Sequence, residues 1–452
     1  MRPADFLPDP EAAARLDRLV KAALEAGASA ADAVEFKNTS IGVSYRLGQL
    51  EDVGRSESSD LGLRVFVGRQ VAFVSSTDFS KAALDQLPER AVAMAKLAPE
   101  DKFAGLAPSE LLAQDIAALD LDDPVHIPTT LLVERARAAE ATALDTPGIT
   151  NSEGGSADYG RTSVTLATSG GFIGGYAGTS HGVSVSVIAG EDTLMERDYD
   201  YSRARYASDL TSAEEVGRSA AKRALQRLNP RKVKTQSATV IFDPRVSSSL
   251  VGHFVGAISG NAIARGVSFL KDRMGQAVFA PGISIIDDPH RKRGLRSKPF
   301  DGEGVRNRRQ VLIDQGVLTT WLMDSASARQ LGLTTTGHAS RGTGGPPGPS
   351  PTNLYMAAGT QTPAELMADL RDGFYVTELI GQGVNGVTGD YSRGAAGFWI
   401  ENGQLSFPVS EVTIAGNLKD MYVNMTPAND LVFEHGTDAP TIRVEGMTIA
   451  GA

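Results

Sequence analysis

The sequence contains no cysteine. This absence excludes disulfide bonds, iron–sulfur clusters and zinc sites that use thiolate ligands. It also fits a reducing compartment, so we expect a cytoplasmic protein. Long apolar runs are missing as well. No stretch approaches the roughly 20 apolar residues that cross a bilayer, and the opening MRPADFLPDPEAAARL lacks the apolar core of a signal peptide. We therefore expect no association with a membrane.

An excess of positive charge is also missing, because 44 Lys and Arg residues stand against 54 Asp and Glu residues and the formal net charge is -10. Recognition of phosphates needs a basic face, so general binding of nucleic acid is not expected. The remaining composition, 41% apolar and 22% charged over 452 residues, is ordinary for a globular protein of two or three domains. The 48 glycines favour β-structure with many turns.

The order of the periodic segments predicts an α+β fold. We expect an N-terminal α+β region over residues 1–105, a central region of strands and helices over 106–231, and a strand-dominated C-terminal domain with an embedded helix over 237–452. The basic segment RKVKTQ, which follows the helix-stopping Pro230, marks the boundary before the last domain.

Local patterns predict the elements of the N-terminal region. A helix is expected over residues 10–26, with Leu24 on its apolar face. The stretch SIGVSYRLG alternates like a half-buried strand, which places Leu47 on the buried side. A second helix, over residues 81–97, is expected to be interrupted by Pro88.

Two further segments are expected to be irregular. Residues 98–128 are rich in Asp, Pro and Ala, and they read as a linker or a covering segment. GTGGPPGPSPTN, from Gly342, is too rich in Pro and Gly for regular structure, so it is expected to be a surface loop or the wall of a cleft. By contrast, FWIENGQLSFPV predicts a β-hairpin with a type I′ turn at Asn402 and Gly403.

The best-defined element of the C-terminal domain is a helix that starts at Asp243 and Pro244, a good N-cap followed by proline at the first helical position. Apolar side chains then recur every fourth residue, at Val246, Leu250, Phe254 and Ile258. We expect this face to pack into the domain's core. Small residues lie on another part of the helix, at Gly252, Gly256, Ala257 and Gly260. Such residues let a second backbone approach, so the helix is expected to be tightly buried.

The same helix is similar to the metal-binding helix of a zinc peptidase from which the ligands have been removed. His253 lies in its middle, but Phe254 follows where such a helix carries Glu, and no second His lies three to five residues further on. A lone His beside an apolar face is more often packed and hydrogen-bonded than catalytic. We therefore expect a structural role for His253.

Two short motifs match functional patterns but lie in the wrong context. Residues 178–182, GTSHG, match the nucleophile elbow G-x-S-x-G, yet the following VSVSVIAG alternates like a strand where the elbow needs a helix. Residues 381–386, GQGVNG, match the dinucleotide pattern G-x-G-x-x-G, yet no helix can start in that loop. Both are expected to be β-turns.

One polar segment, IIDDPHRKRGLRSKPFDGEG, gathers acidic residues and a histidine around basic ones. The candidate ligands are Asp287, Asp288, His290, Asp301 and Glu303. Their spacing fits no established metal-ligand pattern, so a solvated, salt-bridged loop is favoured over a metal site. The same charges would also suit a peptide or a partner subunit.

Four long blocks occur in order along nearly the whole chain. They are SDLGLRVFVGRQVAFVSSTDFS, ISGNAIARGVSFLKDRMG, IIDDPHRKRGLRSKPFDGEGVRNRRQVLIDQGVLTTWLMDSASARQLGL and GFYVTELIGQGVNGVTGDYSRGAAGFWIENGQLSFPVSEVTIAGNL. Together they resemble the PmbA/TldD (modulator of DNA gyrase) family, and the last two resemble its PmbA branch, also called TldE.

That resemblance implies one subunit of a cytosolic metalloprotease. In the family, a TldD-type subunit binds zinc through an H-E-x-x-x-H helix and a later Cys, and its Glu is the general base. A PmbA-type subunit pairs with it to remove leader peptides and to degrade unfolded polypeptides. When ARGVS is aligned with the zinc subunit's R-G-T-S, the first His falls on Val251, the Glu on Gly252 and the second His on Gly256. The resemblance thus implies no catalytic, metal-binding or cofactor-binding residue in this chain, with zinc held by the TldD-type partner.

Two alternatives stay open. The chain would be a peptidase by itself if other residues, such as the cluster from Asp287 to Glu303, supplied the chemistry. It would otherwise be a homo-oligomeric protein that binds peptides without cleaving them. A heterodimer with the TldD-type subunit is the expected assembly, and a homodimer is an option for the isolated chain.

Overall fold

The first half of the chain forms one long antiparallel sheet. The computed structural model describes residues 9–451, and the first eight residues, where the sequence predicts no signal peptide, lie outside this range. The sheet has the strand order β3-β2-β1-β4-β5-β6. Its strands are β1 (Ala30–Arg46), β2 (Gln49–Val67), β3 (Gln70–Ser76), β4 (Ile149–Thr168), β5 (Ile173–Ala189) and β6 (Glu196–Ala204). Because β1 pairs with both β2 and β4, the N-terminal and central parts of the chain share this sheet.

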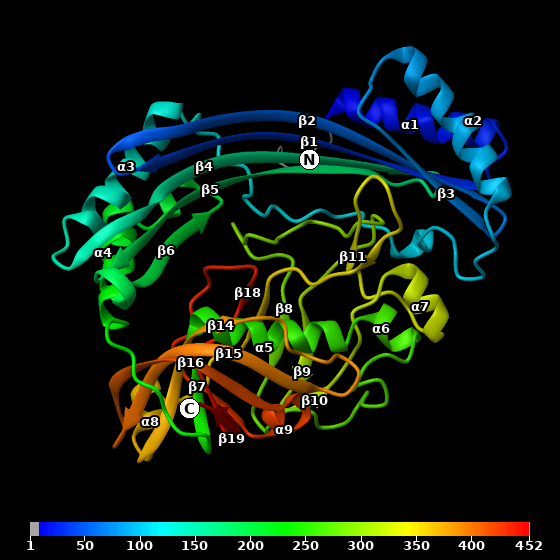
Figure 1. Ribbon diagram of the computed structural model, residues 1–452. Helices are drawn as coiled ribbons and strands as arrows, with labels where there is room; N and C mark the ends of the chain where they lie inside the picture. The colour runs from blue at the N-terminus through cyan, green and yellow to red at the C-terminus, as the bar shows by residue number, and fades with distance from the viewer. Residues whose placement is uncertain (1–8, 452) are drawn as a thin grey trace.

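Helices cover both ends of the sheet (Figure 1). They are α1 (Pro10–Glu25) and α2 (Lys81–Leu97) at one end, and α3 (Thr129–Leu144) and α4 (Ala213–Gln226) at the other. Helix α1 begins as expected, since the Asp9 side chain accepts a hydrogen bond from the backbone N–H of Glu11. Leu24 is 39% exposed, so its place on the buried face was wrongly predicted. It lies one residue beyond Ala23, and the 100° turn per residue carries it off the buried stripe.

Two other local predictions are wrong in detail. Helix α2 continues through Pro88 instead of being interrupted, and Pro88 is itself buried. The apolar surface buried by its ring offsets the backbone hydrogen bond that proline cannot donate. Strand β1 ends at Arg46, and Leu47 lies in the turn to β2 with a φ of 47° and 53% of its surface exposed. The alternating pattern was thus extended one step past the end of the strand.

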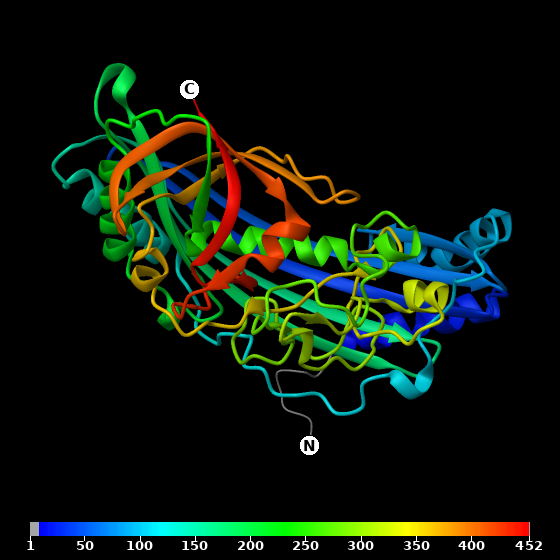
Figure 2. The same ribbon diagram turned by 90° about the horizontal axis from the view of Figure 1, so that it is seen from below.

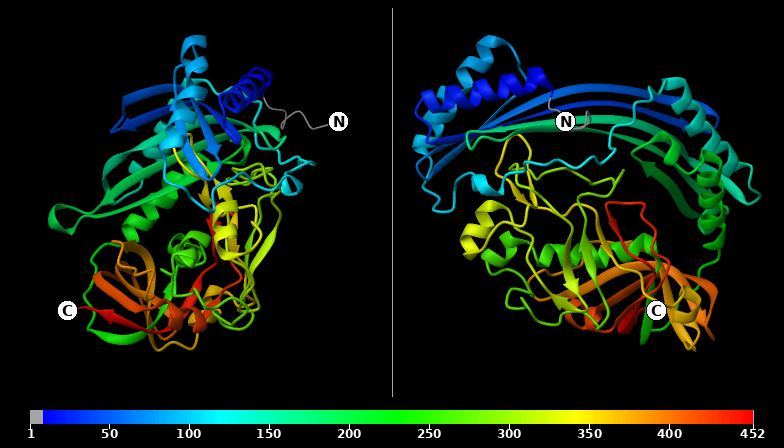
Figure 3. Two further views of the ribbon diagram at one scale, coloured as in Figure 1. Left: turned by 90° about the vertical axis from the view of Figure 1, so that its right-hand side faces the viewer. Right: turned by 180° about the vertical axis from the view of Figure 1, so that it is seen from behind.

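The C-terminal domain is built on a second large sheet with the order β16-β15-β14-β7-β19-β17. Its strands are β7 (Gln236–Phe242), β14 (Asp372–Ile380), β15 (Asp390–Glu401), β16 (Gln404–Asn417), β17 (Met425–Pro427) and β19 (Ile442–Ala450). An extra pairing of β16 with β19 closes five of these strands into a ring. The long sheet arches over this domain (Figures 1 and 3), and Figure 2 shows the domain from below, in front of the sheet.

Shorter elements complete the C-terminal domain. A smaller sheet has the order β10-β9-β8-β13-β18. Its strands are β8 (Ile285–Asp287), β9 (Gln310–Asp314), β10 (Val317–Leu318), β13 (Leu354–Met356) and β18 (Thr437–Asp438). A two-stranded ribbon joins β11 (Ala339–Ser340) to β12 (Gly348–Pro349). The helices are α5 (Pro244–Ala257), α6 (Gly260–Ala264), α7 (Ser325–Leu331), α8 (Pro363–Met367) and α9 (Leu418–Val423). Among residues 9–451, no helix has the length and hydropathy that a membrane span requires.

Helix α5 packs as the sequence predicts. The side chains of Val246, Leu250, Phe254 and Ile258 are all buried. Phe254 meets the ring of Phe279 edge-on, with 5.2 Å between the centroids. The predicted hairpin is also confirmed, because β15 and β16 are joined at Asn402 and Gly403, with φ values of 50° and 79° as a type I′ turn requires. With long strands and separate helices in both halves, the α+β prediction is confirmed.

The Gly/Pro-rich segment from Gly342 is neither free nor wholly irregular. Gly348 and Pro349 pair with β11, so the prediction that this segment forms no regular structure is wrong at these two residues. The segment wedges against the long sheet, because a Cβ atom added to Gly62 in β2 would lie 2.3 Å from the backbone oxygen of Thr343. Pairing needs only two residues in extended backbone, which proline tolerates at an edge.

Beside this wedge lies a fully buried ion cluster. The carboxylate of Asp32 in β1 accepts hydrogen bonds from the guanidinium of Arg64 and, over 2.7 Å, from that of Arg341. Arg64 also lies 3.8 Å from Glu303 of the C-terminal domain. Burial alone would raise the pKa of Asp32, but Arg341 and Arg64 hold it below its ordinary value. The charged carboxylate therefore ties the long sheet to the C-terminal domain.

Residues 98–128 form a covering segment that connects the same two parts. The segment is irregular except for a short 3₁₀ helix at Ser109–Leu111. The Arg329 guanidinium of α7 donates hydrogen bonds of 2.7 to 3.1 Å to the carbonyls of Phe103, Gly105 and Leu106. The carbonyl groups of the covering segment thus accept the hydrogen bonds that this cation of the C-terminal domain donates.

The contact between Gly62 and Thr343 predicts a specific sensitivity. The substitution Gly62→Ala is expected to lower the free energy of unfolding by about 2 kcal/mol, because the new methyl group has no room unless the 341–347 segment moves. The matched control is Gly42→Ala in β1, where an added Cβ would meet nothing within 4 Å. Urea unfolding measures both. Equal effects of the two substitutions would show that the wedge does not form.

Candidate functional site

Helix α5 lies on the side of the C-terminal domain that faces the long sheet (Figure 1). Gly252 and Gly256, four residues apart on one face of the helix, are exposed, and an added Cβ at either would meet nothing within 4 Å. The prediction that small residues bury this helix tightly is therefore wrong at these two positions. It holds at Gly260, where an added Cβ would lie 2.7 Å from Ser327 Oγ. The apolar stripe packs α5 into the domain's core, and the glycine face stays open.

His253 is half-buried, and its ring meets that of Tyr391 edge-on at 6.0 Å. Burial lowers the pKa of His253, and the positive charge of Arg393 lowers it further, so the imidazole is neutral at neutral pH. Its Nε2 atom is buried without a hydrogen-bond partner among the described residues. The ring is packed as expected, but it is not fully hydrogen-bonded.

The residues along α5 do not fit a zinc ion. Val251 is buried, and neither it nor the two glycines has a side-chain atom that can coordinate a metal or accept a proton. Within residues 9–451, no group of three or more His, Cys, Asp or Glu side chains is arranged to hold a metal ion. The side chains at these three positions thus provide no metal ligand, and the helix face at the two glycines is open.

A cavity of about 380 Å³ lies beside the first two turns of α5, between the central region and the C-terminal domain. It is lined by residues 197–199 of β6, Arg227, Arg245, Val246 and Ser249 of α5, residues 377–379 of β14, and Arg393 of β15. Four guanidinium groups and two carboxylates, those of Asp198 and Glu378, line it, which leaves a formal excess of two positive charges. An enclosed excess of one sign of charge favours binding of the opposite sign.

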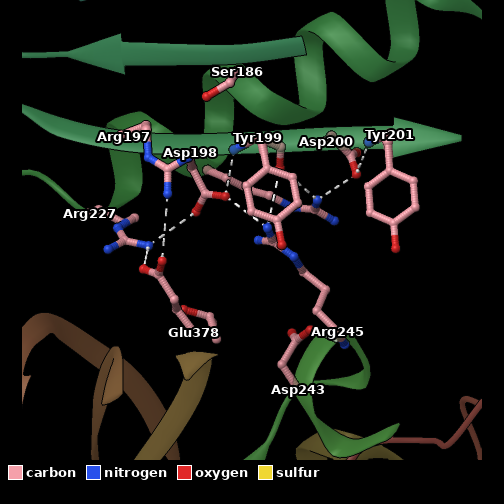
Figure 4. A network of polar contacts seen from close by, with 12 residues as sticks. Ser186, Arg197, Asp198, Tyr199, Asp200, Tyr201, Arg227, Asp243, Arg245 and Glu378 are labelled. Atoms are coloured by element: carbon pink, nitrogen blue, oxygen red, sulfur yellow. Dashed lines mark hydrogen bonds and ion pairs between the residues drawn. The ribbon is translucent and has the colours of Figure 1, made fainter. Parts of the chain in front are cut away.

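Most of these charges form an ionic network that joins the two domains (Figure 4). Arg227, just after α4, donates to Glu378 of β14 over 2.5 Å, and Arg245 of α5 donates to Asp198 of β6 over 2.9 Å. The guanidinium of Arg245 also lies over the ring of Tyr199, 4.6 Å from its centroid. Burial alone would lower the pKa of Arg245, but Asp198 raises it, so the cation keeps its charge.

A second hollow, of about 510 Å³, lies on the other side of Tyr199. Its aromatic lining is continuous: the Tyr199 and Tyr201 rings stack at 6.3 Å, and the Tyr201 and His435 rings stack at 5.4 Å. Burial raises the pKa of Tyr201, so its hydroxyl stays protonated and can donate a hydrogen bond. The two hollows share Tyr199, so polar and aromatic surfaces follow one another along β6.

The acidic segment predicted to be a solvated loop or a metal site is neither at its two ends. Asp287, Asp301 and Glu303 are at most 2% exposed. Asp287 accepts hydrogen bonds from Thr352 and His338, and Asp301 accepts three from backbone N–H groups. Buried carboxylates need such donors, and the sequence does not show which residues provide them.

The two candidate residues between these ends, Asp288 and His290, are only partly buried. The side chain of Asp288 accepts a hydrogen bond from the backbone N–H of His290, and the His290 ring lies 2.7 Å from the amide oxygen of Asn307. The five candidate residues are thus held in separate hydrogen-bonding arrangements and do not form one site.

Both short motifs lie where no catalysis is expected. Residues 178–182 lie inside β5, with His181 fully buried, so rejecting the nucleophile elbow is supported. The expected β-turn is wrong, because the strand runs straight through the motif. Residues 381–386 form the loop between β14 and β15, as predicted.

The ionic network was missed by sequence reasoning. RDYDYSR, from Arg197, alternates charged and aromatic residues in a strand pattern, and this was the available signal. Its partners, Arg227, Arg245 and Glu378, come from distant parts of the chain. No local pattern links them.

Asp198 is expected to hold the two domains together. The substitution Asp198→Asn should lower the free energy of unfolding by about 2 kcal/mol, because it leaves Arg245 inside the interface without its carboxylate partner. The control is Glu153→Gln, whose half-exposed carboxylate pairs with Arg197 at 3.5 Å and should matter by less than about 1 kcal/mol. Chemical unfolding measures both variants. An unchanged free energy of unfolding in Asp198→Asn would show that this network does not hold the domains together.

The buried carboxyl group of Asp301 is expected to make the free energy of unfolding depend on pH. Burial raises the pKa of Asp301 to about 7, and Glu303 contributes to the rise, whereas the unfolded value is near 3.8. The folded chain holds this proton more tightly, so the group's stabilising contribution is complete below about pH 4 and is lost as the pH rises toward 7. Asp301→Asn removes this titration. Between pH 5 and pH 8 the variant should therefore gain about 2 kcal/mol relative to the unsubstituted chain.

The control for this comparison is Asp272→Asn, a change at an exposed residue. It should leave the pH dependence of unfolding as it is in the unsubstituted chain. Thermal or chemical unfolding at several pH values measures both variants. A parallel pH profile for Asp301→Asn would refute the raised pKa.

Comparison with known proteins identifies the family. Sequence patterns of the PmbA/TldA metallopeptidase match residues 31–95 as domain 1, 122–228 as the central domain and 235–451 as the C-terminal domain. The chain is 42% identical to the metalloprotease PmbA of Escherichia coli O157:H7, over 96% of each chain. It is 38% identical to the metalloprotease PmbA homolog of Haemophilus influenzae, over 96% of this chain and 94% of that one.

The fold is similar as well. A putative modulator of DNA gyrase from Bacteroides thetaiotaomicron superposes with a TM-score of 0.90 at 25% identity, over 98% of this chain and 99% of that one. The matches in sequence and in structure both extend over nearly the whole chain. The chain therefore belongs to the PmbA/TldD family of metallopeptidases.

Proposed function

We propose that this chain is the PmbA/TldE-type subunit of a cytoplasmic zinc peptidase, and that a TldD-type partner holds the zinc ion and the general base. The supporting observation is the open face of α5. At the positions aligned with the partner's Glu and second His, Gly252 and Gly256 offer neither a metal ligand nor a base. The helix is retained as a scaffold, and its face toward the long sheet is left clear.

Other residues of the chain are poor substitutes for that chemistry. The buried carboxylates of Asp287, Asp301 and Glu303 are held by structural hydrogen bonds, so none points a free oxygen at an accessible water molecule. A general base must lie within hydrogen-bond reach of the proton it removes. This disfavours the alternative of a peptidase that acts alone through the Asp287–Glu303 segment.

An exposed strand edge supports the proposal of a partner. Strand β3 pairs only with residues 61–67 of β2, and all ten residues from Gln49 to Ser58 are exposed. Within residues 9–451, no strand pairs with this stretch of β2 on the side away from β1. Unpaired backbone groups along such an edge are usually paired or covered by another chain. A heterodimer with the zinc subunit satisfies this requirement.

The proposed substrates are leader peptides and unfolded polypeptides. Extended chains commonly bind next to sheets through main-chain hydrogen bonds, with little dependence on sequence. The hollows on either side of Tyr199 lie between β6 and the C-terminal domain, and side chains of an extended chain fit their size better than a folded domain does. In this proposal the chain shapes the substrate chamber.

The test is co-expression with the TldD-type subunit encoded in the same genome. The purified chain alone is expected to hold no stoichiometric zinc and to cleave no peptide. The pair should form a heteromeric complex that holds zinc and cleaves a flexible peptide in a chelator-sensitive way. Size-exclusion chromatography, elemental analysis and peptide cleavage report the three results.

A variant on each side sharpens this test. Gly252→Ala in this chain should leave the complex active, because the position has room and provides no chemistry. Replacement of the Glu in the partner's zinc helix should abolish cleavage. About one tightly held zinc per isolated chain would overturn the proposal. Self-association and peptide binding without any pairing would favour the homo-oligomeric alternative.

A further inference from the structure

Arg393 is the one guanidinium of the cavity beside α5 that has no carboxylate partner among the described residues. It is 9% exposed, and its Nε donates to the carbonyl of Ile380 over 3.3 Å. No carboxylate oxygen of residues 9–451 lies within 4.0 Å of its nitrogen atoms. Its side chain lines the cavity, and its terminal nitrogens make no hydrogen bond to the described residues. A guanidinium in this state is buried at a cost that an anion would offset.

The neighbouring arginines do not relieve this imbalance. Arg227 and Arg245 use Glu378 and Asp198 in the contacts that join the domains. Arg197 is paired only loosely, at 3.5 Å from Glu153 and 3.9 Å from Glu378. The cavity thus contains the unpaired positive charge of Arg393 and the weakly paired charge of Arg197, and the nearest carboxylates are already engaged.

The shape of the site favours a carboxylate that belongs to a peptide. A guanidinium binds a carboxylate through two parallel hydrogen bonds, which fixes its orientation. The cavity of about 380 Å³ has room for an acidic side chain or a chain terminus, and it meets the aromatic hollow at Tyr199. A peptide can therefore place its carboxylate at Arg393 while its next residues lie against Tyr199 and Tyr201.

We propose that this cavity is a carboxylate-binding subsite for polypeptide substrates, with Arg393 as the main contact and Arg197 beside it. The ligand is an Asp or Glu side chain or a C-terminal carboxylate. The subsite rests on the proposed function, because it assumes that peptides enter this space. It gives a chain without catalytic residues a direct part in substrate selection, next to the open face of α5.

The test uses the full chain and three fluorescein-labelled peptides of otherwise identical Gly, Ser and Ala sequence. The first has a central Glu and an amidated C-terminus, the second a central Gln and a free carboxylate, and the third a central Gln and an amidated C-terminus. Fluorescence anisotropy at low salt should show about tenfold tighter binding of the first or the second than of the third. If the first peptide binds more tightly, the site takes an acidic side chain. If the second does, the site takes a C-terminal carboxylate.

Variants tie the preference to the cavity. Arg393→Gln should abolish the difference between the peptides, Arg393→Lys should retain part of it, and the control Arg308→Gln, at an exposed arginine in a different pocket, should keep it. Ser249→Glu supplies an independent check, because it places a carboxylate in the same cavity without altering Arg393. This substitution should weaken the binding of the carboxylate-containing peptides and leave the binding of the third peptide unchanged. Circular dichroism establishes that each variant is folded.

Equal binding of the three peptides, or an unchanged preference in Arg393→Gln, would show that the subsite does not exist. The same peptides are then used in cleavage assays with the zinc subunit added. Cleavage without a carboxylate preference would overturn the subsite and leave the proposed function standing. A carboxylate preference in the isolated chain without pairing or cleavage would overturn the proposed function and leave the binding site.

Discussion

The buried carboxylate of Asp32 is the contact on which the relation between the two halves of the molecule depends. It lies in the long sheet, yet one of its two arginines, Arg341, belongs to the C-terminal domain. Removal of the Asp32 carboxylate would leave the two buried guanidinium groups without the partner that they share, which costs several kcal/mol. The Gly62–Thr343 contact fixes the same junction sterically. A second ionic junction, at Asp198, holds the opposite side and forms the walls of the cavity beside α5.

These two junctions explain why a helix with an open face can be kept in place. Helix α5 is fixed from below by its apolar stripe, through Leu250 and Phe254, and at its first turn by Arg245. Its glycine face then needs no contact of its own. The same ionic contacts leave one cation, Arg393, unpaired among the described residues, so the binding surface that we propose is a by-product of how the domains are joined.

Local periodicity predicted those parts of the fold that neighbouring residues determine. The stripe from Val246 to Ile258 and the turn at Asn402 are of this kind, because helical spacing and positive φ are properties of a few consecutive residues. Glycine was less informative. Gly252 and Gly62 look alike in sequence, but one faces open space and the other a backbone oxygen at 2.3 Å from an added Cβ. Only the packing of distant segments distinguishes them.

The candidate site was the least predictable part for the same reason. Arg227 and Glu378 are 151 positions apart, and Asp32 and Arg341 are 309 apart. Opposite charges are common in any sequence, so the pairs become meaningful only once the sheet and the domain are docked. Acidic residues such as Asp301 were assigned to a solvated loop because exposed carboxylates are the usual case. The backbone N–H donors that permit its burial leave no trace in the sequence.

The exposed stretch of β2 has a consequence for how a cell must handle this protein. Ten residues of unpaired strand edge are a template for pairing with any other extended chain, including a second copy of the same one. The three acidic residues there, Glu51, Asp52 and Glu57, outnumber the single Arg55 and oppose self-pairing through charge repulsion, but salt weakens that protection. A protein that covers this edge would therefore protect the chain from such pairing only if it were made in a matching amount. In the complex that we propose, balanced synthesis of the two subunits would therefore serve solubility as much as activity.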